Sequence, residues 1–237
     1  MVCCAFLFTA ITCFAQGPDA DTLSRQAMID DIVDSFNKNI GDQSHLYNGP
    51  EYTFYDPAIK GNAYYKDDAN FLTGRVEYDG FVYKDVSLLY DLNKDVLVLQ
   101  LPSKVIKLAL IKDRVQNFDM DNHHFVNINA DTISKPGSIP SGFYDRLYNG
   151  KIDMLVRREK NIQSTSNAEN YFNASTNIYI KKGGIYTKVS GKGDVLDVLK
   201  DKKDALKKYI RSNNIKFGDD EELATVRVVS YYDQLTQ

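Results

Sequence analysis

The stretch that decides the fold runs from residue 74 to residue 92 and reads GRVEYDGFVYKDVSLLYDL. Asp79-Gly80 lies in its middle, between two runs that are rich in β-forming residues. Both residues of a two-residue type I′ turn need a positive φ, which Asp and Gly tolerate. We therefore predict a β-hairpin that turns at Asp79 and Gly80 and places Tyr78 opposite Phe81 on the core-facing side.

The second arm of this hairpin changes its alternation. Tyr83 belongs to the odd-numbered apolar positions, whereas Val86 and Leu88 belong to the even-numbered ones. Strict alternation would place Asp85 in the core, so we expect a β-bulge at Lys84-Asp85 that bends the arm. A bent and twisted hairpin suits a curved sheet or a barrel.

The composition is that of an ordinary globular protein. The chain has 237 residues, of which 43% are hydrophobic, so it is long enough to build a core without disulfides. The net charge is −3 at pH 7. This balance argues against a nucleic acid or an anionic membrane surface as the main partner.

The N-terminal residues 1–15 carry no charge and are mostly apolar. They are too few to span a membrane as a helix but have the length of the apolar part of a signal peptide. We therefore predict a signal peptide over residues 1–15, cleaved between Ala15 and Gln16, and an exported protein that is periplasmic or extracellular. The alternative is a buried apolar N-terminal strand.

All three cysteines, Cys3, Cys4 and Cys13, lie in this segment. A mature chain without them has no disulfide, no thiolate nucleophile and no zinc site built on cysteine. A lipid anchor on Cys13 is the alternative to a free exported protein, although residues 10–12, Ala-Ile-Thr, match a lipoprotein signal poorly.

Residues 16–237 are expected to form a single α+β domain. Apolar residues recur at helical spacing from Met28 to Ile40, which predicts an N-terminal helix. Residues 46–190 are β-rich, and the period becomes helical over residues 194–235. The predicted architecture is a curved, mainly antiparallel β-sheet or partly open barrel with an N-terminal helix and C-terminal helices.

Short β-rich runs separated by turn residues predict a meander of about nine or ten strands. Gly183-Gly184 has the sequence of a second tight hairpin turn. We expect one or two helical turns at Phe143–Tyr148 and a polar loop at Gln163–Asn170. The other expected strands are Val96–Leu101, Val105–Ile111, Val115–Met120, His124–Ile128 and Ile152–Arg158.

Three segments carry a resemblance to known proteins: LYNGPEY at Leu46–Tyr52, YDGFVYKDVSLLYDL at Tyr78–Leu92, and YYDQL at Tyr231–Leu235 after a Lys-rich helical tail. In these segments the chain resembles a group of uncharacterised secreted or periplasmic proteins of Bacteroidota-type Gram-negative bacteria. The resemblance implies targeting to the cell envelope. It implies no activity.

One group of side chains resembles a metal site, namely Asp119, Asp121, His123 and His124. Neutral imidazole and carboxylate are good ligands for transition metals. Adjacent histidines on a strand point in opposite directions, however, and the group falls where a turn between two strands is expected. A polar hairpin tip is therefore the favoured interpretation.

Asp91, Asn93 and Asp95 have the spacing that opens a calcium-binding loop. The sixth position of that loop is Val96, where a Gly is needed, and the twelfth is Pro102, where a Glu is needed. We therefore expect an ordinary turn between strands at this point.

The sequence leaves two classes of function open. The first is a non-catalytic envelope protein that binds an apolar ligand, a lipid or a protein partner. The alternative is a hydrolase that uses paired carboxylates on a cell-envelope or polymeric substrate. No Gly-x-Ser-x-Gly elbow and no phosphate-binding glycine loop occur, so no catalytic residue, metal ligand or cofactor is assigned. The Lys-rich stretch 200–211 is interleaved with aspartates and is expected to be a solvated helix face.

Overall fold

The computed structural model describes residues 25, 28, 29, 32, 45–101, 105–129 and 137–236. Contacts divide the chain into two units, Met1–Ile40 and Gly41–Gln237. In the first unit only Arg25, Met28, Ile29 and Ile32 are described, and all four are helical. The rest of the predicted N-terminal helix and the predicted cleavage site at Ala15 and Gln16 lie outside the described residues.

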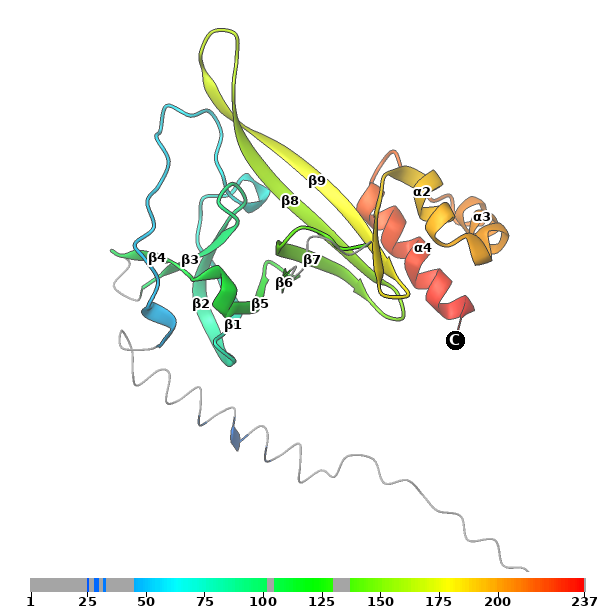
Figure 1. Cartoon of the computed structure of the whole chain (residues 1–237), viewed down its shortest axis with the longest axis horizontal. Coiled ribbons are helices and arrows are strands. Elements are labelled where there is room, and N and C mark those ends of the chain that lie inside the picture. Colours follow the sequence, from blue (N-terminus) through cyan, green and yellow to red (C-terminus); the bar gives the residue numbers. More distant parts are fainter. Residues whose placement is uncertain are drawn as a thin grey trace, which may run out of the picture. The chain divides into compact units, whose positions relative to one another are not determined.

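The second unit is built on one open sheet of ten strands in the order β10-β9-β8-β7-β6-β5-β1-β2-β3-β4, and every neighbouring pair is antiparallel (Figure 1). Two meanders, β1 to β4 and β5 to β10, are joined where β1 pairs with β5. The strands are β1 (Leu72–Tyr78), β2 (Phe81–Asp91), β3 (Val96–Gln100), β4 (Lys107–Ala109), β5 (Val115–Met120), β6 (His123–Ile128), β7 (Gly142–Asn149), β8 (Asp153–Ser164), β9 (Asn170–Lys182) and β10 (Ile185–Val189). The fold is therefore α+β with a mainly antiparallel sheet, as predicted.

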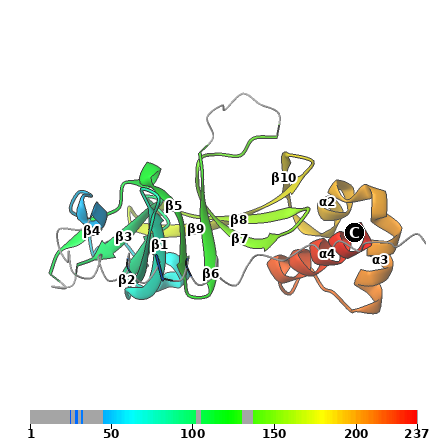
Figure 2. The same cartoon turned by 90° about the horizontal axis from the view of Figure 1, so that it is seen from below.

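Three α-helices follow the sheet and gather beside β7 to β10 (Figure 2). They are α2 (Gly191–Val198), α3 (Lys203–Ser212) and α4 (Glu221–Leu235), and short 3-10 turns are η2 (His45–Tyr47), η3 (Tyr65–Asp67), η4 (Lys112–Arg114) and η5 (Lys200–Lys202). The helical tail was predicted, but η5 interrupts it between α2 and α3. No helix among the described residues is long and apolar enough to cross a membrane.

The hairpin of β1 and β2 turns at Asp79 and Gly80, whose φ angles are 53° and 80°. The register shifts between Gly74 and Val76, and Asp85, which lies opposite this shift on the other strand, has a φ of 55°. This is the bulge expected from the change of alternation. Phe81 is not a core residue, because it lies at the end of the hairpin and is 51% exposed.

Direct pairing aligns six residues across one face of the sheet, here called the inner face. Asp145 on β7 pairs with Val156 on β8 and with Phe125 on β6. The row then continues through β5, β1 and β2, with Phe118, Val76 and Tyr83. Paired residues in an antiparallel sheet point to the same side, so Asp145 is the one charged member of an otherwise apolar row.

Two hydrophobic clusters cover the inner face on either side of Asp145. On β1 to β7 the cluster is aromatic, with Phe118 and Phe125 stacked at 4.6 Å and Tyr90 and Phe143 packed edge-on against Phe118. On β7 to β10 the strands pack against α2, α3 and α4, where residues such as Val228 are fully buried. The sheet therefore has two cores on one face, and the charged row position lies between them.

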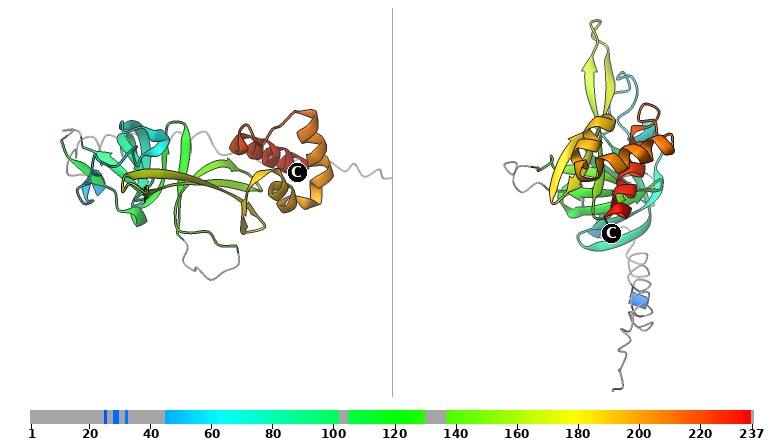
Figure 3. Two further views of the ribbon diagram at one scale, coloured as in Figure 1. Left: turned by 90° about the horizontal axis from the view of Figure 1, so that it is seen from above. Right: turned by 90° about the vertical axis from the view of Figure 1, so that its right-hand side faces the viewer.

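β8 and β9 continue beyond their neighbours as a two-stranded hairpin, whose tip stands clear of the other strands (Figure 3). The pairing of β7 with β8 stops at Asp145 and Val156, whereas β8 and β9 stay paired as far as Ser164 and Asn170. The turn of β2 and β3 meets β8 at this point, because the Lys160 amide donates to the carbonyl of Leu92.

One predicted assignment is wrong, and a second is too long at both ends. Phe143–Tyr148 is part of strand β7 and not a helical turn, because β6 and β8 on either side supply a complete ladder of hydrogen bonds. The predicted loop Gln163–Asn170 is confirmed over residues 165–169 and is wrong only at its ends, since β8 runs to Ser164 and β9 begins at Asn170. The second predicted turn joins β9 and β10, with φ angles of 57° and 83° at Gly183 and Gly184.

Candidate functional site

The residues that resembled a metal site are divided among separate partners. His124 Nδ1 lies 2.5 Å from Asp119, whereas Asp121 lies 2.5 Å from the ammonium of Lys66. His123 points to the inner face, where its Nδ1 lies 2.7 Å from Asp145. Asp121 begins the turn of the β5–β6 hairpin, so the group is a hairpin tip. No group of three or more metal-ligating His, Cys, Asp or Glu side chains occurs in the described part of the chain.

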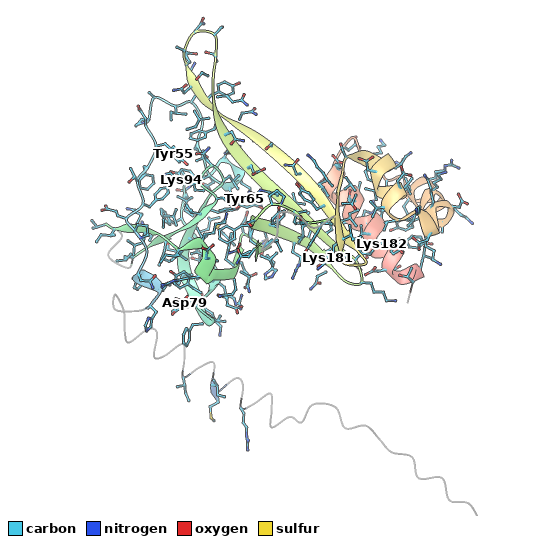
Figure 4. The ribbon with its side chains drawn as sticks, viewed as in Figure 1. Tyr55, Tyr65, Asp79, Lys94, Lys181 and Lys182 are labelled. Carbon is cyan, nitrogen blue, oxygen red and sulfur yellow. The ribbon has the colours of Figure 1, made fainter. Side chains whose placement is uncertain are left out.

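Asp91, which resembled the start of a calcium loop, has a carboxylate whose oxygens accept hydrogen bonds from four groups of the protein. Tyr52 donates to it at 2.7 Å and Tyr55 at 2.9 Å, and the amides of Asn93 and Lys94 donate at 2.8 Å and 3.0 Å. The Lys94 ammonium lies 4.6 Å from the ring of Tyr55, and the two side chains are neighbours in Figure 4. Burial, reinforced by Asp91, raises the pKa of both tyrosines. Asp91 therefore anchors the segment around Tyr52 to the β2–β3 turn.

Asp95 makes a similar structural connection at the other end of this turn. Its carboxylate accepts a hydrogen bond from Tyr90 at 2.8 Å and lies 2.5 Å from the ammonium of Lys112. Arg157 on β8 is 3.7 Å away. The turn between β2 and β3 is thus tied by ion pairs to the strand that leaves the sheet.

The charged position of the inner face forms a cluster that sequence reasoning did not identify, here called the Asp145 cluster. Asp145 is fully buried and contacts His123 at 2.7 Å and Arg158 at 2.9 Å. Arg158 also lies 2.5 Å from Glu222, in the first turn of α4. The ring of Tyr65 lies 5.9 Å from the guanidinium of Arg158 and completes the cluster.

The Asp145 cluster has two acids that are held out of water. Burial raises the pKa of Asp145 against the opposing influence of Arg158 and His123. Burial likewise raises the pKa of Glu222, again against Arg158. Arg158 contacts both carboxylates, so it links β7 to α4 across the boundary between the two hydrophobic clusters. Asp145 has no exposed surface, and Glu222, which is partly exposed, is paired with Arg158.

The outer edge of β9 is a different feature, because some of its backbone N–H and C=O groups have no hydrogen-bond partner in the described part of the chain. Lys60 pairs with this edge at one end, where it accepts from the Phe172 amide and donates to the carbonyl of Asn170. β10 pairs with it at the other end, up to Ile178. Backbone groups alternate in direction along a strand, so those of Ala174 and Thr176 also point outward. Within the described residues nothing pairs with them.

A groove of about 700 Å³ lies along this edge. One side is formed by β9 and by the end of β10, and the other by the segment that leads into α4. The lining residues are Thr176, Asn177, Ile178, Lys188, Val189, Ser190, Asp219, Asp220, Glu221 and Glu222. The groove therefore continues the line of β10 after that strand has ended, with four carboxylates as its far wall.

The chain matches no protein-family model, no curated protein and no solved structure. The β9 edge and its groove therefore provide the geometry that bears on function. Neither was predicted from the sequence, because the residues from Gln163 to Asn177 are mostly polar and show no apolar alternation. The only local signal was the acidic run Asp219–Glu222, which the sequence explains equally well as a helix start.

Proposed function

We propose that this chain is an exported, non-catalytic binding protein that accepts an extended segment of a partner protein as an added strand on the outer edge of β9. The observation that carries the proposal is the pair of outward-facing residues Ala174 and Thr176, whose backbone groups have no partner within the described part of the chain. An unpaired and exposed strand edge is a template for another extended chain.

The dimensions of the vacant edge suit a short segment. It lies between Phe172, whose amide donates to the Lys60 carbonyl, and Ile178, which pairs with Val189. Five strand residues occupy this interval, so an added segment of about five residues, or about 17 Å, would fill it. Each new backbone hydrogen bond contributes about 0.5–1.5 kcal/mol net, so a few of them support a weak and reversible complex.

Other ligands have less support. An apolar ligand needs a vacant apolar concavity, whereas the inner face is occupied by the protein's own buried rings, among them Tyr90, Phe118 and Phe143. Of the aromatic residues near the first hairpin, Tyr78 and Tyr83 are themselves buried in this cluster. The proposal therefore favours a protein partner over a lipid.

The alternative of a hydrolase has one observation in its favour. Asp145 and Glu222 are two carboxyl groups of raised pKa that meet at one guanidinium, and perturbed acids of this kind occur at active sites. It is the weaker candidate because both acids are already paired with Arg158 and Asp145 has no exposed surface. Loss of a measured hydrolytic activity in Asp145→Asn would favour it.

The test of strand addition uses nuclear magnetic resonance on the mature, isotope-labelled chain. The probes are capped peptides of about eight residues in which threonine alternates with lysine, serine or glutamate. We expect at least one of them to slow hydrogen exchange at the amides of Ala174 and Thr176. The Thr176→Pro variant, which lacks the outward N–H, should lose this protection, whereas Thr176→Val should keep it.

A modified peptide keeps the test valid even if the Thr176→Pro protein misfolds. N-methylation of alternate peptide amides removes donors from one edge of the probe and leaves the protein unchanged. The proposal is wrong if no peptide protects the two amides at millimolar concentration, or if N-methylation has no effect. Export is tested separately by intact mass, which should correspond to a chain that begins at Gln16.

A further inference from the structure

We infer that the segment accepted on β9 is basic, with a lysine or arginine at every second position. This inference rests on the proposed function and specifies the chemistry of the partner. Its basis is the acidic far wall of the groove, whose charge the one lining cation does not balance. The lining contains four acidic residues, Asp219, Asp220, Glu221 and Glu222, and one basic residue, Lys188, so its net formal charge is −3.

Part of this wall has an ordinary structural role. Asp220 is the N-cap of α4 and accepts a hydrogen bond from the Leu223 amide at 2.9 Å. Glu221 accepts from the amide of Gly191. Acidic residues are also stabilised near the positive end of a helix dipole. Capping needs only one carboxylate, however, and the wall has four.

The remaining charge faces solvent in the groove. The side chain of Asp219 is 75% exposed, and its nearest cation, Lys216, is 3.9 Å away. Arg158 neutralises Glu222 from inside the protein, where it is directed towards Asp145. An incoming cation would therefore meet at least the carboxylate of Asp219, which is highly exposed and has only a long ion pair with Lys216.

The register decides which side chains of the added strand would meet this wall. Thr176 pairs with Arg158, whose side chain lies on the inner face and contacts Glu222 of α4. A residue directly opposite Thr176 in the added strand also points to the inner face. Side chains alternate between faces, so only every second residue of the segment would lie beside the wall.

The same charge argues against a second copy of this chain as the occupant. Two β9 edges paired about a two-fold axis would bring two acidic walls together, and like charges in close apposition are repelled. Natural sheets use charge in this way to prevent edges from pairing with copies of themselves. The partner is therefore a different protein with a Lys-rich or Arg-rich extended segment.

The test compares the affinities of the three alternating peptides and of a fourth peptide in which the same lysines are clustered at one end. At low ionic strength we expect the alternating lysine peptide to bind about tenfold more tightly than the serine peptide, and the glutamate and clustered peptides to bind more weakly than the alternating lysine peptide. Raising NaCl from about 50 mM to about 500 mM should remove the preference, because exposed charges are screened.

The second part of the experiment uses a double variant in the acidic wall of the groove. Asp219→Asn with Glu221→Gln keeps the acceptor for Gly191 and should reduce lysine-peptide affinity to that of the serine peptide. The matched control is Asp204→Asn with Glu51→Gln, two exposed acids outside the groove lining. Equal affinity for all peptides with protected β9 amides would overturn the basic partner and keep strand addition. Absence of amide protection with every peptide would overturn both.

Discussion

Lys160 holds Tyr64 in place by donating a hydrogen bond from its ammonium to the Tyr64 carbonyl oxygen, 2.8 Å away. The same ammonium donates to the carbonyl of Asn62 at 2.9 Å and lies 2.5 Å from the carboxylate of Asp67. Lys160 is on β8 and is only 4% exposed, so one buried cation fixes the chain just before η3 and the last residue of η3 onto the strand that leaves the sheet.

Replacing this cation should therefore be costly. We expect Lys160→Met, which keeps the aliphatic stem, to lower the free energy of unfolding by about 2–4 kcal/mol, because it leaves buried carbonyl groups without a donor. Chemical denaturation measures the loss. Lys60→Met is the control: its ion pair with Glu169 is exposed, and we expect a change of less than about 1 kcal/mol. Equal losses in both variants would contradict the anchoring role.

Gly80 should resist substitution for a conformational reason alone. Its φ is 80°, and a Cβ added there would meet no atom within 4 Å. We expect Gly80→Val to destabilise the protein by about 1–3 kcal/mol, because a β-branched residue is strained at positive φ. The control is Gly218→Val, at a glycine with equally open surroundings but without a positive φ. Thermal melts that do not distinguish the two variants would contradict the strain at this turn.

Some of these features are determined by residues that are neighbours in the sequence, and only those could be predicted from it. The turn at Asp79 and Gly80 could be predicted, because the conformation is a property of the two turn residues and their neighbours. The alternation that predicts a strand was absent from β7, since Phe143 and Tyr144 are both buried, on opposite faces. A strand that is covered on both sides does not show a period of two residues.

The features of the candidate sites could not be predicted from the sequence for related reasons. The β8–β9 hairpin is exposed on both faces beyond Lys160, so its polar sequence has the composition of a loop. Asp145 becomes distinctive only when the register of six strands places it in an apolar row. The groove requires the start of α4 to lie beside β9, although the two are distant in sequence. The hairpin, the position of Asp145 and the groove all depend on tertiary packing, which the local sequence does not show.

Two tyrosines offer a direct comparison of a satisfied and an unsatisfied hydroxyl group. Tyr52 donates to Asp91 at 2.7 Å, whereas the buried hydroxyl of Tyr65 has no partner among the described residues. We expect Tyr52→Phe to cost about 1–3 kcal/mol, since it removes a hydrogen bond to a charged group. Tyr65→Phe should be neutral or stabilising within about 1 kcal/mol. A larger loss for Tyr65→Phe, measured by denaturation, would show that its hydroxyl is paired after all.

The dependence of stability on pH should reveal the Asp145 cluster. The pKa of Glu222 is raised in the folded state by burial, so the folded protein binds a proton more readily than the unfolded chain does. Its contribution to stability is therefore greatest below the unfolded pKa, near about 4.3, and declines as the pH rises through the folded pKa. Glu222→Gln cannot titrate and loses this dependence.

The predicted measurement is the difference in unfolding free energy between the wild type and Glu222→Gln at several pH values. This difference should shift in favour of the wild type as the pH falls from neutrality towards the ordinary carboxyl range. Asp197→Asn should show the opposite trend, because Lys203 lowers the pKa of Asp197 and its stabilising contribution is lost on acidification. The same direction of change in both variants would contradict the assignment of Glu222 as an acid held out of water beside Arg158.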